Sequence, residues 1–216
     1  MPDAILTLTE AEFPQTLEIL AARDYDLRKI IETHGRPPFF RRAPGFQTLV
    51  HIILEQQVSL ASAKAAFDRT KQKLGDDFTA ADFLKLSDEE LKSLGFSRQK
   101  TVYSRGLANA VASGELDLEQ LEFLPDDAVK NELVKLKGIG RWTADIYLLM
   151  CLLRTDAFPV GDLGLIVGAQ TVKGLPERPT AEKLEQIAET WRPFRAVATR
   201  IVWHYYLKEI RPYSGY

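Results

Sequence analysis

The sequence has a single cysteine, Cys151, and this scarcity excludes several kinds of site. One cysteine cannot form an internal disulfide, and it cannot supply a four-thiolate metal or iron–sulfur centre. Because Cys151 lies inside an apolar run, we expect it to pack in the core.

Long apolar runs and leader-like features are also missing. No stretch of 18 apolar residues occurs, and the first residues, MPDAILTLTEAEF, are acidic where a signal peptide is basic and apolar. We therefore expect a soluble protein of a reducing compartment with no membrane partner. We expect this compartment to be the cytoplasm or, in a eukaryote, the nucleus.

The sequence also lacks an excess of positive charge. It has 28 Lys and Arg against 30 Asp and Glu, which gives a formal net charge of −2. No long-range positive field therefore attracts nucleic acid, and any such contact must be local. The hydrophobic content of 45% is enough for a sizeable core.

Strand-like alternation is nearly absent, whereas apolar residues recur at helical spacing through most of the chain. This pattern predicts an all-α protein of about ten helices. The segment WTADIYLLMCLL is apolar on nearly every side, which indicates a helix enclosed by others. The expected helices cover residues 13–22, 25–33, 46–55, 59–74, 88–94, 97–112, 126–137, 141–153, 180–191 and 193–209, with another beginning near 162.

Two glycines, Gly138 and Gly140, stand at the start of the enclosed segment. A Gly-x-Gly turn clears side chains from the amino end of the following helix, so that its amides can hold an anion such as a DNA phosphate. Lys135 and Lys137 flank the turn and favour that ligand. Taken alone, the turn is more typical of a plain helix C-cap.

The spacing further along the chain adds to this pattern. Twenty residues beyond Trp142, Asp162 stands at a helix start after Pro159 and Gly161. An isolated aspartate there is usually an N-cap. The combination of LKGIGRWTADIYLL and DAFPVGDLG, however, resembles the signature of the helix-hairpin-helix (HhH-GPD) DNA glycosylases: a hairpin, a Gly/Pro-rich loop and an aspartate.

Three more segments, residues 46–67, 94–111 and 191–206, are similar to those of the bacterial 3-methyladenine DNA glycosylase II family. The resemblance implies a two-lobed all-α fold with the active-site cleft between the lobes, and a compact form without the additional N-terminal β domain of some members. One lobe covers roughly residues 46–135, the helix-hairpin-helix covers 126–154, and the rest of the second lobe comes from 1–45 and 155–216, all within one unit of residues 1–216.

The resemblance also assigns roles to individual residues. Asp162 is the expected catalytic carboxylate. It would stabilise the oxocarbenium cation that forms on deoxyribose when the N-glycosidic bond breaks, and would orient or deprotonate the attacking water. Trp142, Trp203 and Tyr205 are the expected base pocket, because aromatic faces attract a flat, electron-poor ring. Core packing remains an alternative for the tryptophans, and it is favoured for Trp191.

The expected DNA contacts lie in two turns. A side chain of the Gln56–Gln57 turn would fill the gap left by a flipped base, although a polar helix kink is the alternative. A monovalent cation on hairpin carbonyls would be structural, as in many relatives, and no cofactor is expected. The hairpin residues expected to contact the DNA backbone are Lys137, Gly138, Ile139, Gly140 and Arg141.

Together these features predict a monofunctional DNA glycosylase that flips and hydrolytically excises alkylated purines, 3-methyladenine and 7-methylguanine, in base excision repair. Relatives that also cleave the strand have a lysine at the position of Trp142, which cannot form a Schiff base. We expect a monomer that binds double-stranded DNA containing damaged bases and, in a prokaryote, is associated with the nucleoid. The alternatives are a non-catalytic helix-hairpin-helix DNA-binding protein, or a glycosylase of the same fold for another lesion. Ile146 stands where the 3-methyladenine DNA glycosylase II family commonly has an aromatic residue, so the sequence does not determine which lesion is preferred.

Overall fold

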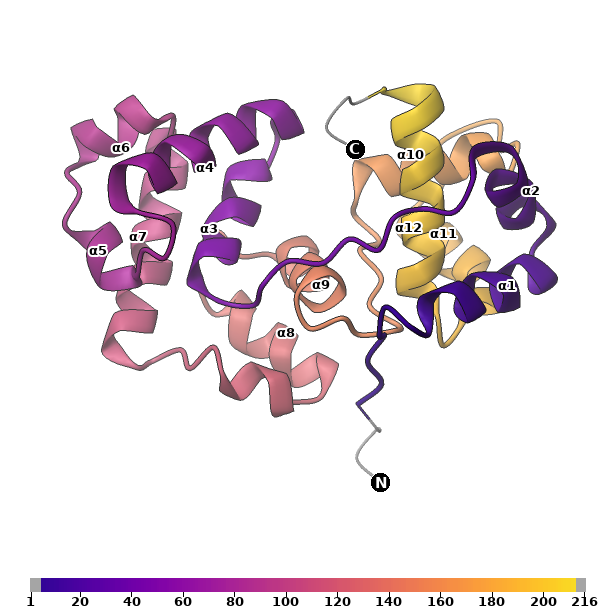
Figure 1. Ribbon diagram of the computed structural model, residues 1–216, viewed down its shortest axis with the longest axis horizontal. Coiled ribbons are helices and arrows are strands. Elements are labelled where there is room, and N and C mark those ends of the chain that lie inside the picture. The colour runs from indigo at the N-terminus through magenta and orange to yellow at the C-terminus, as the bar shows by residue number, and fades with distance from the viewer. Residues whose placement is uncertain (1–4, 213–216) are drawn as a thin grey trace. The chain divides into compact units, whose positions relative to one another are not determined.

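The computed structural model describes residues 5–212 of the chain. Within that range the protein has twelve α-helices, and its β pairing is limited to a single bridge between Thr7 and Arg154. The predicted all-α class is confirmed. The chain divides into two compact units, one formed mainly by residues 42–147 and the other by residues 6–41 together with the chain from residue 148 onward (Figure 1).

The first unit is built around α3, which lies against α4 and α7 (Figure 1). Helix α3 carries a run of buried aliphatic side chains. The short helices begin where the sequence supplies caps: Ser87 Oγ accepts the Glu90 amide at 3.1 Å, and the Glu90 carboxylate accepts the Ser87 amide at 2.9 Å. These two reciprocal bonds form a capping box. The helices of this unit are α3 (Phe46–Glu55), α4 (Leu60–Leu74), α5 (Ala80–Leu84), α6 (Asp88–Leu94), α7 (Arg98–Ser113) and α8 (Asp126–Val134).

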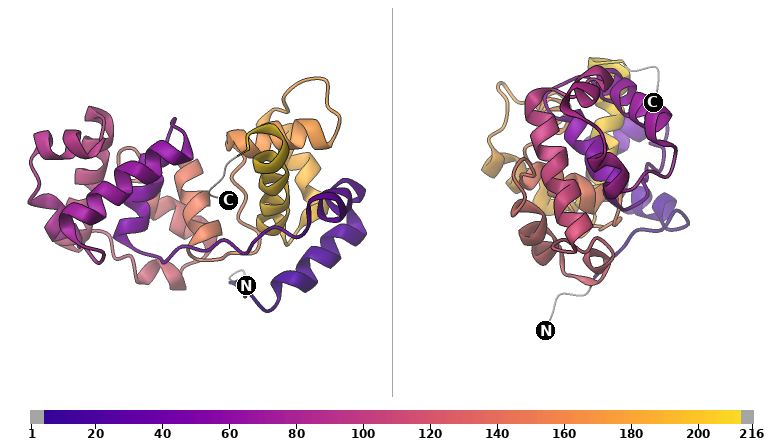
Figure 2. Two further views of the ribbon diagram at one scale, coloured as in Figure 1. Left: turned by 45° about the horizontal axis from the view of Figure 1, so that its top comes forward. Right: turned by 90° about the vertical axis from the view of Figure 1, so that its left-hand side faces the viewer.

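The second unit is built around α12 (Arg195–Tyr205), which packs against α1, α2 and α10 (Figure 2). Gly168 lets α10 approach α12 closely, because a Cβ at this position would lie 2.6 Å from Cγ1 of Val202. The chain continues from α12 into a π-helical turn, Tyr206–Ile210. The other helices of this unit are α1 (Phe13–Arg23), α2 (Tyr25–His34), α10 (Leu163–Val172) and α11 (Ala181–Ala188).

Helix α9 (Arg141–Met150) is the enclosed segment predicted from the sequence, and the boundary between the two units falls after its residue Tyr147. It ends earlier than the predicted residue 153, since Leu153 adopts a left-handed backbone conformation with φ +53°. Cys151, just beyond the helix, is buried as predicted.

Trp191 is a core residue of the second unit, in agreement with the alternative favoured for it. Its indole Nε1 donates to Asp24 Oδ2 at 2.7 Å, and Lys173 Nζ lies 2.7 Å from the same oxygen. Burial raises the pKa of the Asp24 carboxyl, but the hydrogen bonds from Lys173 and Trp191 outweigh burial and leave this pKa below its ordinary value. The carboxylate thus joins α2 to the residues that follow α10 and α11.

Candidate active site

Asp162 caps the amino end of α10, with φ −74° and ψ 124°. Its Oδ1 accepts the backbone amide of Leu165 at 2.8 Å and the indole Nε1–H of Trp203, from α12, also at 2.8 Å. The N-cap role predicted for an isolated aspartate is therefore real. The bond from Trp203 is an addition to it, and the two donors together fix the orientation of the carboxylate.

Trp203 is half-buried and packs against the core of the second unit, so core packing accounts for part of its role. The resemblance predicts that its ring stacks on a base. The structure shows that its N–H is directed at Asp162, which is the predicted catalytic residue. Trp203 therefore connects α12 to the first turn of α10.

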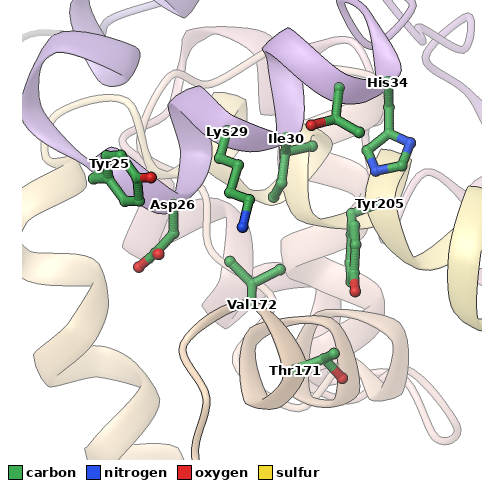
Figure 3. Close-up of a pocket in the computed structure, with 9 residues that line it drawn as sticks. Tyr25, Asp26, Lys29, Ile30, His34, Thr171, Val172 and Tyr205 are labelled. Carbon is green, nitrogen blue, oxygen red and sulfur yellow. The ribbon is translucent and has the colours of Figure 1, made fainter.

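Tyr205 is not brought to Asp162. Residues two apart on an α-helix point about 200° apart, so Tyr205 lies on the side of α12 away from Trp203. Its ring packs edge-on against His34, with the ring centroids 5.7 Å apart. It lines a pocket with residues of α2, among them Tyr25 and Lys29 (Figure 3).

Tyr206 is the aromatic residue that sequence reasoning missed. It follows Trp203 by three positions and so lies on the same side of the helix. A Cβ at Gly164 would lie 3.3 Å from Cδ1 of Tyr206 and 3.2 Å from Oδ1 of Asp162, which places the Tyr206 ring against the first turn of α10. The i, i+3 spacing from Trp203 was the signal that could have identified it.

The two hairpin glycines serve different purposes. Gly138 has φ +92°, and a Cβ there would lie 2.0 Å from Cγ of Tyr103, so the ring of Tyr103 requires glycine at this position. A Cβ at Gly140 would meet no heavy atom within 4 Å. Helix α8 ends at Val134, well before Gly138, so the glycine does not simply end that helix.

The side chains around the hairpin are partly exposed and partly buried. Lys137, Gly140 and Arg141 are exposed, whereas Ile139 is only 3% exposed and packs into the unit. A DNA contact at Ile139 would therefore use its backbone. Trp142 is half-buried on the first turn of α9, in the first unit, while Asp162 and Trp203 belong to the second.

The two glutamines between α3 and α4 also differ. Gln56 is half-buried, and its Nε2 donates to the Gly138 carbonyl at 2.9 Å and to Thr143 Oγ1 at 3.1 Å. Gln57 is exposed and adopts a left-handed backbone with φ +58°. The predicted break in the helix is confirmed, and the unusual backbone of Gln57 makes it without glycine or proline.

The hairpin carbonyls are the atoms that could hold a monovalent cation. The Leu136 carbonyl accepts the Ile139 amide at 3.0 Å, and the Gly138 carbonyl accepts from Gln56. Because a carbonyl oxygen has two lone pairs, these bonds are compatible with a cation on the turn. Over residues 5–212, His, Cys, Asp and Glu form no group of three or more that could hold a metal ion, and no helix in that range is long and apolar enough to cross a membrane.

Comparison with known proteins identifies the family. The model of the family described as "HhH-GPD superfamily base excision DNA repair protein" matches residues 50–193, so the chain belongs to this family.

Relatives and solved structures agree with this assignment. The chain is 28% identical over 198 residues to a DNA-3-methyladenine glycosylase of Bacillus subtilis, a match that covers 87% of this chain and 62% of that protein. Its fold is similar to that of the Schizosaccharomyces pombe 3-methyladenine DNA glycosylase in complex with abasic DNA, with a TM-score of 0.81, 26% identity, and coverage of 88% of this chain and 95% of the other. It is also similar to the DNA-3-methyladenine glycosidase of Bacillus halodurans, with a TM-score of 0.76, 31% identity, and coverage of 97% and 95%.

Proposed function

We propose that the chain is a monofunctional DNA glycosylase that excises alkylated purines, 3-methyladenine and 7-methylguanine, from double-stranded DNA. The observation that carries this proposal is the Asp162 carboxylate, oriented by the Leu165 amide and the Trp203 indole. A protein that only binds DNA has no need for such a group. In such a protein the carboxylate would weaken binding, because it repels phosphate.

The chemistry requires cleavage of the bond between a base and the C1′ atom of deoxyribose. An alkylated purine carries positive charge and leaves with the electrons of that bond, so the sugar becomes an oxocarbenium ion. An ionised carboxylate beside the sugar lowers the energy of this cation. Asp162 then orients water for attack on C1′, and the proton lost by that water passes to the carboxylate or to solvent.

Aromatic rings supply the selectivity for a cationic base. In this proposal Trp203, bonded to Asp162, offers a flat surface on which the base stacks. Tyr206 adds a wall beside Asp162, where its ring packs against Gly164. Neutral purines gain less from this attraction, so the alkylated base is retained longer next to the carboxylate.

The hairpin holds the DNA backbone. The exposed amino end of α9, with Gly140 and flanked by Lys137 and Arg141, offers amides and positive charge to a phosphate. Gln57, exposed on the turn after α3, takes the place of the flipped nucleotide. The protein acts on DNA as a monomer, and a cation on the hairpin carbonyls has a structural role only.

Trp142 stands where strand-cleaving relatives have a lysine, so the reaction is hydrolysis without cleavage of the strand. Product analysis on duplexes that each carry one defined lesion tests the proposal. We expect free 7-methylguanine or 3-methyladenine and an abasic strand that stays intact until alkali is added. Binding without release would identify a DNA-binding protein, and release of an oxidised or mismatched base alone would identify another lesion class.

A further inference from the structure

The side chain of Gln56 connects two segments that lie far apart in the sequence. Its amide nitrogen has two hydrogens and finds two acceptors, the Gly138 carbonyl at 2.9 Å and Thr143 Oγ1 at 3.1 Å. One acceptor lies in the hairpin turn and the other in the first turn of α9. Both donor hydrogens are therefore used inside the protein.

Two other contacts hold the same region together. Lys100 Nζ, from α7, donates to the Leu54 carbonyl in the last turn of α3 at 2.6 Å. The ring of Tyr103, also from α7, lies over Gly138 so closely that a Cβ there would be 2.0 Å from its Cγ. The end of α3, the start of α7 and the hairpin thus form one connected cluster within the first unit.

The neighbouring residue, Gln57, shows what this cluster supports. Its φ of +58° is uncommon for a residue with a side chain, and such conformations persist only where the surroundings over-determine them. Gln57 itself is exposed, so its own side chain is not buried against the protein. Gln56, the residue before it, is the anchor of the turn.

We propose that Gln56 is a positioning residue and that it does not contact DNA itself. Its amide fixes the turn at residues 56–58 to the hairpin, so that Gln57 enters the duplex at a set distance from the phosphate-binding amides of α9. This inference rests on the proposed function. It departs from the sequence-based prediction, which placed Gln56 among the DNA contacts.

The chain offers a matched control in Gln47, at the other end of α3. Its Nε2 donates to the Phe78 carbonyl at 3.0 Å, so Gln47→Ala removes the same kind of bond from the same helix. The test variants are Gln56→Ala, Gln56→Glu, whose carboxylate faces a carbonyl it cannot donate to, and Thr143→Val, which removes one acceptor at nearly constant volume.

Three measurements separate positioning from binding and from stability: the single-turnover excision rate at saturating enzyme, the Kd for the lesion duplex, and the fluorescence of 2-aminopurine beside the lesion, which reports base flipping. For Gln56→Ala we expect the rate and the flipping signal to fall about tenfold while Kd changes less than about threefold. Gln56→Glu is expected to fall further, Thr143→Val less, and Gln47→Ala to stay near wild type despite a similar loss of thermal stability.

Equal rates for Gln56→Ala and Gln47→Ala would overturn the inference, because the bond would then serve stability alone. A weaker Kd with an unchanged rate would also overturn it, and would return Gln56 to the DNA contacts. If the wild-type protein releases no base, the proposed function fails, but the 2-aminopurine signal still decides the role of Gln56.

Discussion

Removal of a single N–H group tests how Asp162 is held in place. Trp203→Phe keeps an aromatic ring but removes the donor that lies 2.8 Å from Oδ1 of Asp162. A hydrogen bond to a charged group contributes about 1.5–3 kcal/mol, which corresponds to about 10- to 150-fold in rate if the bond is needed in the transition state. Since Trp203 is half-buried and the Leu165 amide remains, we expect a loss at the lower end, about 10- to 30-fold.

The assay is single-turnover release of 7-methylguanine at saturating enzyme, performed as a double-mutant cycle with Asp162→Asn. If Trp203 acts by orienting the carboxylate, Trp203→Phe should have little further effect once the carboxylate is gone. A full loss in both backgrounds would refute the reasoning, because it would mean that Trp203 acts on the base alone. The Kd for undamaged duplex should be unchanged in either case.

Two further predictions concern the hairpin and the Asp24 cluster. Gly140→Ala should weaken binding to undamaged duplex about tenfold and reduce the salt dependence of binding by about one phosphate contact, without loss of thermal stability. The control is Gly106→Ala in α7, where an added Cβ also meets no heavy atom within 4 Å. This control variant should bind as wild type. If Gly140→Ala binds normally, this glycine has no part in DNA contact. Asp24→Asn should lower the free energy of unfolding at pH 7 by about 2 kcal/mol. Because the folded-state pKa of Asp24 is lowered, the stabilisation by its carboxylate is complete above the unfolded pKa of about 3.9 and is lost as the pH falls through the folded-state pKa. In urea denaturation, the difference in free energy of unfolding between Asp24→Asn and wild type should therefore narrow below about pH 4. A difference in this free energy that stays constant with pH would contradict the prediction.

Much of the fold could be predicted from local patterns. Apolar spacing is a property of neighbouring positions, so eleven of the twelve helices in the described part of the chain and the break after Glu55 were identified from the sequence, whereas the short helix α5 was missed. The ends were less predictable where the backbone departs from regular geometry. Leu153 stops α9 early, and the π-helical turn after Tyr205 replaces the regular end of α12.

The candidate site was predicted only in part. The position of Asp162 at a helix start follows from Gly161 and the residues around it, but its bond to Trp203 joins positions 41 residues apart and no local pattern contains it. Helix α12 is buried on nearly every side, so apolar spacing did not indicate which tyrosine faces α10. The difference between Gln56 and Gln57 also depends on partners of Gln56 that lie more than 80 residues away in the sequence, and no local pattern contains them.

The most direct test of the account is the rate of base release by Asp162→Asn. Asparagine keeps an oxygen that can accept the Leu165 and Trp203 donors, so the cap and the fold should be preserved while the negative charge is lost. At saturating enzyme on a duplex with one 7-methylguanine, we expect release to fall at least about 100-fold with an unchanged Kd. Release at the wild-type rate would contradict the assignment of Asp162 as the catalytic carboxylate.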